Sequence, residues 1–371
     1  MTRKKFDLVL LFAVLMLVAI GLVFVYSASM YTAQITYGNK HFLLTKQAFG
    51  AAVGLIAMLA ISQINLKFIK KLWIVGIVVA AVLLALVFVP GLGIENYGAK
   101  RWIGVGSFSM QPSEIAKFAF VLFTAVFMEK ADMGKFRNCL VVIGVGVVFC
   151  GLIITEPNMS ITMCMAMLMV IMLFLGGMKW KHFLLLLVPM VLAVPVLIFM
   201  EPYRLQRLLA FLDPWASPKD EGYQLIQSLY ALGNGGFFGV GLFNSRQKYR
   251  FLPFAESDFV FSIIGEETGL FGCALVFLLF LVVILRGVRI AANSKDKFSC
   301  YLASGIAAVI AVQAGLNFAV VTGSIPPTGL PLPFISYGGT SLVVFMTAIG
   351  VLLNLSREVI SNNLEGKLWI T

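Results

Sequence analysis

Residues 8–26 read LVLLFAVLMLVAIGLVFVY, an unbroken apolar run. At a helical rise of about 1.5 Å per residue, such a run is long enough to cross the roughly 30 Å hydrocarbon core of a bilayer. Similar runs recur along the 371-residue chain, which is 60% hydrophobic, only 12% charged and has a mean hydropathy of +0.96. This composition excludes a water-soluble enzyme, a disordered protein and a disulfide scaffold. It predicts an all-α integral membrane protein.

Ten segments have the length and apolarity of transmembrane helices. They are residues 7–27, 47–64, 72–90, 113–129, 139–155, 158–176, 182–200, 258–286, 300–322 and 336–356. We expect one polytopic membrane domain over residues 1–371. Within it, residues 201–257 form a large extracytoplasmic loop between the seventh and eighth spans, far longer than a bare connector needs. The basic start Arg3-Lys4-Lys5 resembles a signal peptide, but the following apolar run is long enough to predict an uncleaved first span.

The distribution of lysine and arginine predicts how these spans are oriented. An even number of spans puts both termini on one side of the membrane, and 17 basic residues lie on that side. The opposite side has ten, six of them in the long loop, where the positive-inside trend counts least. Both termini are therefore predicted to be cytoplasmic. The net charge of +11 does not indicate nucleic-acid binding, because the basic residues lie between apolar runs and form no basic face.

Ionisable residues inside membrane spans are costly and are candidates for function. Glu114 and Lys117 are three residues apart and can pair on one helix face, either as a structural ion pair or as part of a site. Asp258 lies at the outer mouth of the eighth span, where it is either a helix N-cap or a carboxylate that takes a proton or binds a divalent cation. Glu266 and Glu267 lie about 12 Å deeper and are predicted to be structural, hydrogen-bonded groups.

The outer side also carries basic residues, which run against the usual charge trend. Arg207 is one of several in the long loop, and arginine suits an anionic ligand such as phosphate. In the same loop, residues 221–232 have the pattern of a short amphipathic helix at the membrane interface. Two classes of protein fit these features, an enzyme acting on a lipid-linked anionic substrate or a transporter of such a substrate. A carboxylate at one surface beside a large loop on that side favours the enzyme.

Five blocks of sequence stand out in order along the chain. They are NYGAKRWI at 96–103, QPSEIAK at 111–117, RLLAFLDPW with GYQ at 207–224, SDFVF with GEETGL at 257–270, and PTGLPLPFISYGG at 327–339. These blocks resemble the SEDS family (shape, elongation, division and sporulation), which includes FtsW, RodA and SpoVE. The resemblance covers nearly the whole chain, and the long-loop run is more similar to FtsW and SpoVE than to RodA.

The resemblance implies a peptidoglycan glycosyltransferase of the bacterial cytoplasmic membrane. Such proteins polymerise lipid II into glycan strands at the outer face, for cell division or sporulation, and they work with a class B penicillin-binding transpeptidase and other divisome or elongasome membrane proteins. A lipid II flippase is the alternative function.

The resemblance also implies roles for particular residues. The family's key carboxylate falls on Asp258, as a general base or as a ligand of Mg²⁺ or Mn²⁺. The set implied to bind substrate and pyrophosphate is Arg101, Gln111, Glu114, Lys117, Arg207 and Ser336, and the set implied to be structural is Trp102, Glu266 and Glu267.

The chain departs from the family pattern at one turn near these blocks. Where the family usually has Gln-Pro-Asp, this chain reads Glu156-Pro157-Asn158. A role for a carboxylate in this turn is therefore in doubt, unless Glu156 substitutes for the missing aspartate.

Overall fold

The computed structural model of the chain describes residues 6–96, 99–105, 108–200 and 202–368. The basic cluster Arg3-Lys4-Lys5, and Tyr97 and Gly98 of the first family block, lie outside the described residues. Each of the ten predicted spans overlaps one long helix. These helices are α1 (Leu8–Tyr37), α2 (Phe42–Ile61), α4 (Trp73–Leu86), α5 (Pro112–Lys130), α6 (Phe136–Thr155), α7 (Met159–Leu175), α8 (Trp180–Phe199), α11 (Val260–Ala292), α12 (Lys297–Val321) and α13 (Gly339–Leu368).

Length and composition mark several of these helices as membrane-spanning. In the described part of the chain, α1, α2, α6, α11, α12 and the segment Gly339–Val359 of α13 are long and apolar enough to cross a bilayer. Helices α4 and α7 and the segment Trp180–Pro189 of α8 are shorter and also apolar. The protein is therefore a multi-pass membrane protein, and the number of ten spans stays a prediction.

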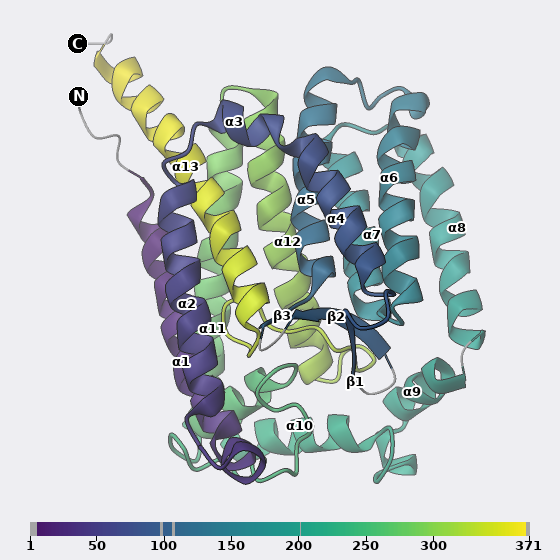
Figure 1. Cartoon of the computed structure of the whole chain (residues 1–371), viewed down its shortest axis with the longest axis vertical. Coiled ribbons are helices and arrows are strands. Elements are labelled where there is room, and N and C mark those ends of the chain that lie inside the picture. The colour runs from purple at the N-terminus through teal and green to yellow at the C-terminus, as the bar shows by residue number, and fades with distance from the viewer. Residues whose placement is uncertain (1–5, 97–98, 106–107, 201, 369–371) are drawn as a thin grey trace.

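Helix α12 lies in the middle of the bundle, where it packs against α5, α7, α11 and α13. Around this centre, α1 packs on α11 and α2 on α13, while α4 packs on α5. Helix α1 begins and α13 ends at the same end of the bundle (Figure 1). At that end Asp7 caps α1 by accepting a hydrogen bond from Leu10 N (3.0 Å) and accepts another from Arg286 Nε (2.6 Å), which ties α1 to α11.

The opposite end of the bundle carries the smaller elements (Figure 1). They are the antiparallel sheet of β1 (Gly93–Asn96), β2 (Ala99–Val105) and β3 (Phe108–Met110), then α9 (Pro202–Leu212), the 3₁₀ turn η1 (Pro214–Ala216) and α10 (Tyr223–Gly235). Helix α3 (Leu66–Lys71) lies at the end where the chain termini emerge. The small sheet is an addition to the all-α fold predicted from sequence, because its longest strand, AKRWIGV at Ala99–Val105, does not alternate apolar with polar residues.

Helix α11 is broken at Gly269, which has φ +65 and ψ −162. Two peptide N–H groups and two carbonyls around the break bond to the loop 236–241 instead of to the helix. These bonds join Leu270 N to Gly236 O (2.9 Å), Phe271 N to Phe237 O (3.3 Å), Val240 N to Glu266 O (2.9 Å) and Gly241 N to Glu267 O (3.1 Å). The sequence predicts one continuous span over 258–286, and the structure divides it into two helical pieces joined at this glycine.

Candidate active site

The segment 256–258 lies directly before α11 and is held at its backbone by the loop 327–338 and by α12. Each of its three carbonyl oxygens accepts a hydrogen bond. The donors are Tyr337 N to Glu256 O (2.8 Å), Ser336 Oγ to Ser257 O, and Asn317 Nδ2 to Asp258 O (2.8 Å). These three bonds fix the main chain of the segment, and this arrangement positions the Asp258 side chain.

The loop 327–338, called the clamping loop from here on, is itself held by three amide side chains. On α12, Asn317 Nδ2 also donates to Leu330 O (2.7 Å), and Gln313 Nε2 donates to Pro331 O (3.0 Å). On α2, Gln47 donates to Ser336 O (3.0 Å) and accepts from Gly338 N (3.1 Å). Sequence reasoning missed these amides. The available signal was their polarity inside or beside predicted apolar spans, with Gln313 and Asn317 one helical turn apart.

Asp258 does not cap α11, since the N-cap residue is Phe259 and its side chain makes no capping bond. Its half-buried carboxylate faces Gly329, where an added Cβ would come within 3.0 Å of Asp258 Oδ2. Burial, with a smaller contribution from the charge of Glu256, raises the pKa of Asp258 to about 6, against the lowering effects of a hydrogen bond from Ser257 and of the charges of two arginines. The group is therefore a stronger base than a free aspartate.

The two arginines are Arg101 on β2 and Arg207 on α9, and each has an electrostatic effect on Asp258. Arg101 is half-buried, and its guanidinium donates from Nη2 to Pro157 O (2.6 Å) and from Nε to Glu156 O (3.4 Å) at the turn between α6 and α7. Arg207 is exposed on α9. Two cations that are distant in sequence thus act on the Asp258 carboxylate at one end of the bundle, and arginines are suited to bind an anionic group there.

Glu114 and Lys117 form a fully buried ion pair, with Lys117 Nζ 3.0 Å from Glu114 Oε1. Lys117 also donates to Gln313 Oε1, and Ser341 Oγ donates to Glu114 Oε2 (3.3 Å). The pair therefore joins α5 to α12 and α13, and it bonds to the same Gln313 that holds the clamping loop. Direct contact of either residue with a substrate stays a prediction.

Three further candidate residues lie close to these elements in the chain. Gln111 is the buried residue directly before α5, and Trp102 lies on β2 opposite Ile94 of β1. The buried hydroxyl of Ser336 accepts from Leu332 N (2.7 Å) as well as donating to Ser257 O. Both hydrogen-bonding roles of the hydroxyl are used inside the protein, which gives Ser336 a positioning function in the geometry.

Glu266 and Glu267 are buried beside the break in α11, where they fasten the loop that follows α10. Glu266 accepts from Ser245 Oγ, Arg246 N (3.1 Å) and Gln247 N (3.3 Å). Glu267 accepts from Ser27 Oγ (2.6 Å), Ser245 N (3.2 Å) and the buried Lys248 Nζ (3.2 Å). Both carboxylates therefore have multiple donors, as expected for structural groups.

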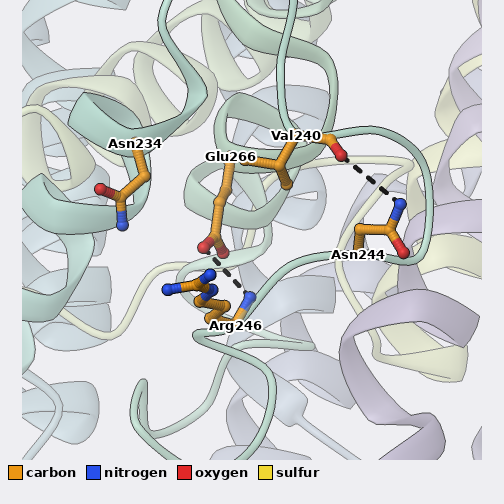
Figure 2. A pocket seen from close by; sticks show the side chains of 5 residues that line it. All are labelled: Asn234, Val240, Asn244, Arg246 and Glu266. Atoms are coloured by element: carbon orange, nitrogen blue, oxygen red, sulfur yellow. Dashed lines mark hydrogen bonds between the residues drawn. The ribbon is translucent and has the colours of Figure 1, made fainter.

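A cavity of about 370 Å³ lies where this loop meets α11. Figure 2 shows its lining residues, with the Arg246 backbone N–H bonded to Glu266 and the amide of Asn244 bonded to Val240 O (3.4 Å). Asn234 of α10 completes the lining. This cavity contains none of the residues predicted to bind substrate, and its one carboxylate is already satisfied by the loop.

The fold and the site define a multi-pass membrane protein in which a carboxylate, Asp258, and two arginines, Arg101 and Arg207, form a site at one end of the helical bundle. Residues 8–360 match the family model of FtsW, RodA and SpoVE, which is described as a cell cycle protein. The chain belongs to this family, and the family predicted from the sequence motifs is confirmed.

Individual relatives are similar over nearly their whole length. Stage V sporulation protein E of Bacillus subtilis (strain 168) is 40% identical over 363 residues, which cover 96% of this chain and 99% of the relative. A probable peptidoglycan glycosyltransferase FtsW of Geobacter sp. (strain M18) is 38% identical, covering 96% and 98% of the two chains. Among solved structures, a chain from work on structural coordination of polymerization and crosslinking by a peptidoglycan synthase complex superposes with a TM-score of 0.80 at 27% identity, covering 96% and 98%.

Proposed function

We propose that this protein is a peptidoglycan glycosyltransferase that polymerises lipid II into glycan strands at the outer face of the bacterial cytoplasmic membrane, for cell division or sporulation. The observation that carries the proposal is Asp258, fixed at its backbone and acted on by the charges of Arg101 and Arg207. The names of the similar FtsW proteins support the reaction.

The reaction is glycosyl transfer with inversion. The 4-hydroxyl of the acceptor sugar attacks the anomeric carbon of the lipid-linked donor, a new glycosidic C–O bond forms, and the bond to the prenyl pyrophosphate breaks. Asp258 accepts the proton of the attacking hydroxyl. With its pKa raised to about 6, Asp258 is ionised at neutral pH and is more basic than a free aspartate. General-base catalysis of this kind contributes about 10²–10⁴-fold to the rate.

The leaving pyrophosphate needs positive charge where its own negative charge develops. Arg101 and Arg207 supply this positive charge, since the charges of both already act on Asp258. Gln111, Glu114, Lys117 and Ser336 complete the proposed substrate site. Their burial indicates that they act chiefly by holding the walls of the site in place.

A divalent cation such as Mg²⁺ or Mn²⁺ fits this site only with help from the substrate. The described residues contain no group of three or more His, Cys, Asp or Glu side chains able to hold a metal. Mg²⁺ commonly binds through one or two carboxylates together with substrate phosphates. Asp258 would be the protein ligand, and the bound ion would neutralise charge on the pyrophosphate.

Partners and orientation extend the proposal. We place both termini in the cytoplasm, which puts the sheet, α9 and α10, at the opposite end of the bundle, on the outer side. Asp258 goes with these elements, since Arg101 on β2 and Arg207 on α9 act on its carboxylate. There it would work beside a class B penicillin-binding transpeptidase and other divisome or elongasome membrane proteins. The similarity to a chain of a peptidoglycan synthase complex supports such an assembly.

The test is polymerisation of labelled lipid II by the purified protein with its partner transpeptidase. Asp258→Asn should lower the rate by about 10²–10⁴-fold, because the amide cannot take the proton. Asp220→Asn, at an exposed position of the long loop, is the matched control and should keep full activity. Undiminished synthesis by Asp258→Asn would remove Asp258 from the mechanism, and lipid II translocation in liposomes without polymerisation would favour a flippase.

A further inference from the structure

Glu156 is a buried carboxyl group that the proposed mechanism leaves unused. It ends α6 at the turn into α7, and its side chain is 0% exposed. Within the described part of the chain, neither Oε1 nor Oε2 has a hydrogen-bond partner. A charged carboxylate in such a place is costly, so the group is expected to be neutral unless a cation compensates it.

The nearby cation is Arg101, which is bonded to the backbone of this same turn. Its guanidinium donates to the carbonyls of Glu156 and Pro157, and its charge acts on the carboxyl groups of both Glu156 and Asp258. The charge of Arg101 therefore acts on two carboxyl groups, that of the buried Glu156 and that of Asp258 in the site.

The other polar and charged groups near the turn are not among those that act on the Glu156 carboxyl. Asn158 is neutral and caps α7 by accepting from Ile161 N (3.3 Å). The ion pair of Lys117 and Glu114 on α5 acts on Cys164, further along α7. Arg101, from β2, is the charged residue that acts on the Glu156 carboxyl among the residues described.

We propose that Glu156 is a positioning residue for glycosyl transfer: its turn directs Arg101 toward the site, and its neutral carboxyl leaves the charge of Arg101 to the pyrophosphate of the donor. This inference rests on the function proposed above. It assigns Glu156 no contact with the reacting atoms, and the effect passes entirely through Arg101.

The protonation of Glu156 gives the inference a measurable signature. Burial raises the pKa of Glu156 to about 8, against the lowering effect of Arg101. Below that pH the carboxyl is neutral and Arg101 is available to the pyrophosphate. Above it, the ionised carboxylate neutralises Arg101 and repels the anionic donor, so binding of the donor weakens.

The experiment is steady-state polymerisation of lipid II by the purified complex between about pH 6.5 and 9.5. The wild-type KM for lipid II should rise by about tenfold through pH 8, with a smaller change in kcat, as expected when one buried charge appears near an anionic ligand. Glu156→Gln should keep a low KM across this range. Glu221→Gln, at an exposed position of the long loop, is the control and should keep the wild-type rise.

The outcomes separate this inference from the function beneath it. A wild-type rise in KM that persists in Glu156→Gln overturns the role of Glu156 and leaves the glycosyltransferase intact. A uniform loss of activity at every pH, with unchanged pH dependence, also overturns it, because it indicates a merely structural residue. If Glu156→Gln does not fold, Glu156→Asp carries the test: it retains a carboxyl group and should retain the rise, and a flat profile overturns the inference. Wild-type protein that makes no glycan at neutral pH defeats the proposed function first.

Discussion

Asp258 is fixed at its backbone, while its carboxylate is tuned by its neighbours. Its pKa is raised to about 6 by burial and by the charge of Glu256. A general base works only when deprotonated, so kcat should fall as pH drops through about 6 and level off just above it. Glu256→Gln removes the neighbouring negative charge and should move this acidic midpoint to lower pH. The measurement is kcat against pH for both proteins, and an unmoved or higher midpoint in Glu256→Gln contradicts the assignment.

At this scale the sequence predicted the charged residues better than the polar ones that hold them. Arg101 and Arg207 were found because basic residues on the predicted outer side run against the usual charge trend, and Asp258 because an ionisable residue at a span is a candidate for function; all three also fall in recognisable motifs. Asn317 and Gln313 were missed because their hydrogen bonds go to backbone carbonyls of distant segments. A carbonyl is present at every position, so such bonds leave no pattern of residue types.

Among the elements, α11 depends most on a single residue. Gly269 has a backbone conformation that residues with a side chain rarely adopt. An added Cβ would also lie 2.5 Å from Gly239 N and from the carbonyl of Phe237. Gly269→Ala should therefore lower the free energy of unfolding by roughly 1–3 kcal/mol. Gly233→Ala, on α10 with nothing within 4 Å of the new Cβ, should be neutral or stabilise by up to about 1 kcal/mol. Thermal unfolding in detergent measures both, and equal melting temperatures would show that the break tolerates a side chain.

The elements also divide into those with a local signal and those without one. The long helices were predictable because each carries its own apolar run. The break in α11 was not, since it exists only where the loop 236–241 supplies partners for the freed backbone groups. The sheet of β1 to β3 is formed by strands of four, seven and three residues, and the longest, AKRWIGV at Ala99–Val105, does not alternate apolar with polar residues.

For the whole molecule, the decisive question is which end of the bundle faces outward. Helix α3, the start of α1 and the end of α13 lie at one end, and the sheet, α9 and α10 lie at the other (Figure 1). The lysine and arginine distribution predicts that the first end lies in the cytoplasm. In a cysteine-free background, Lys219→Cys in the long loop should react with a membrane-impermeant maleimide in intact cells. Lys295→Cys, exposed in the turn between α11 and α12, should react only after permeabilisation. The reverse pattern would place Asp258 in the cytosol, where a glycan strand made for the outer wall could not be released, and the proposed reaction would fail with it.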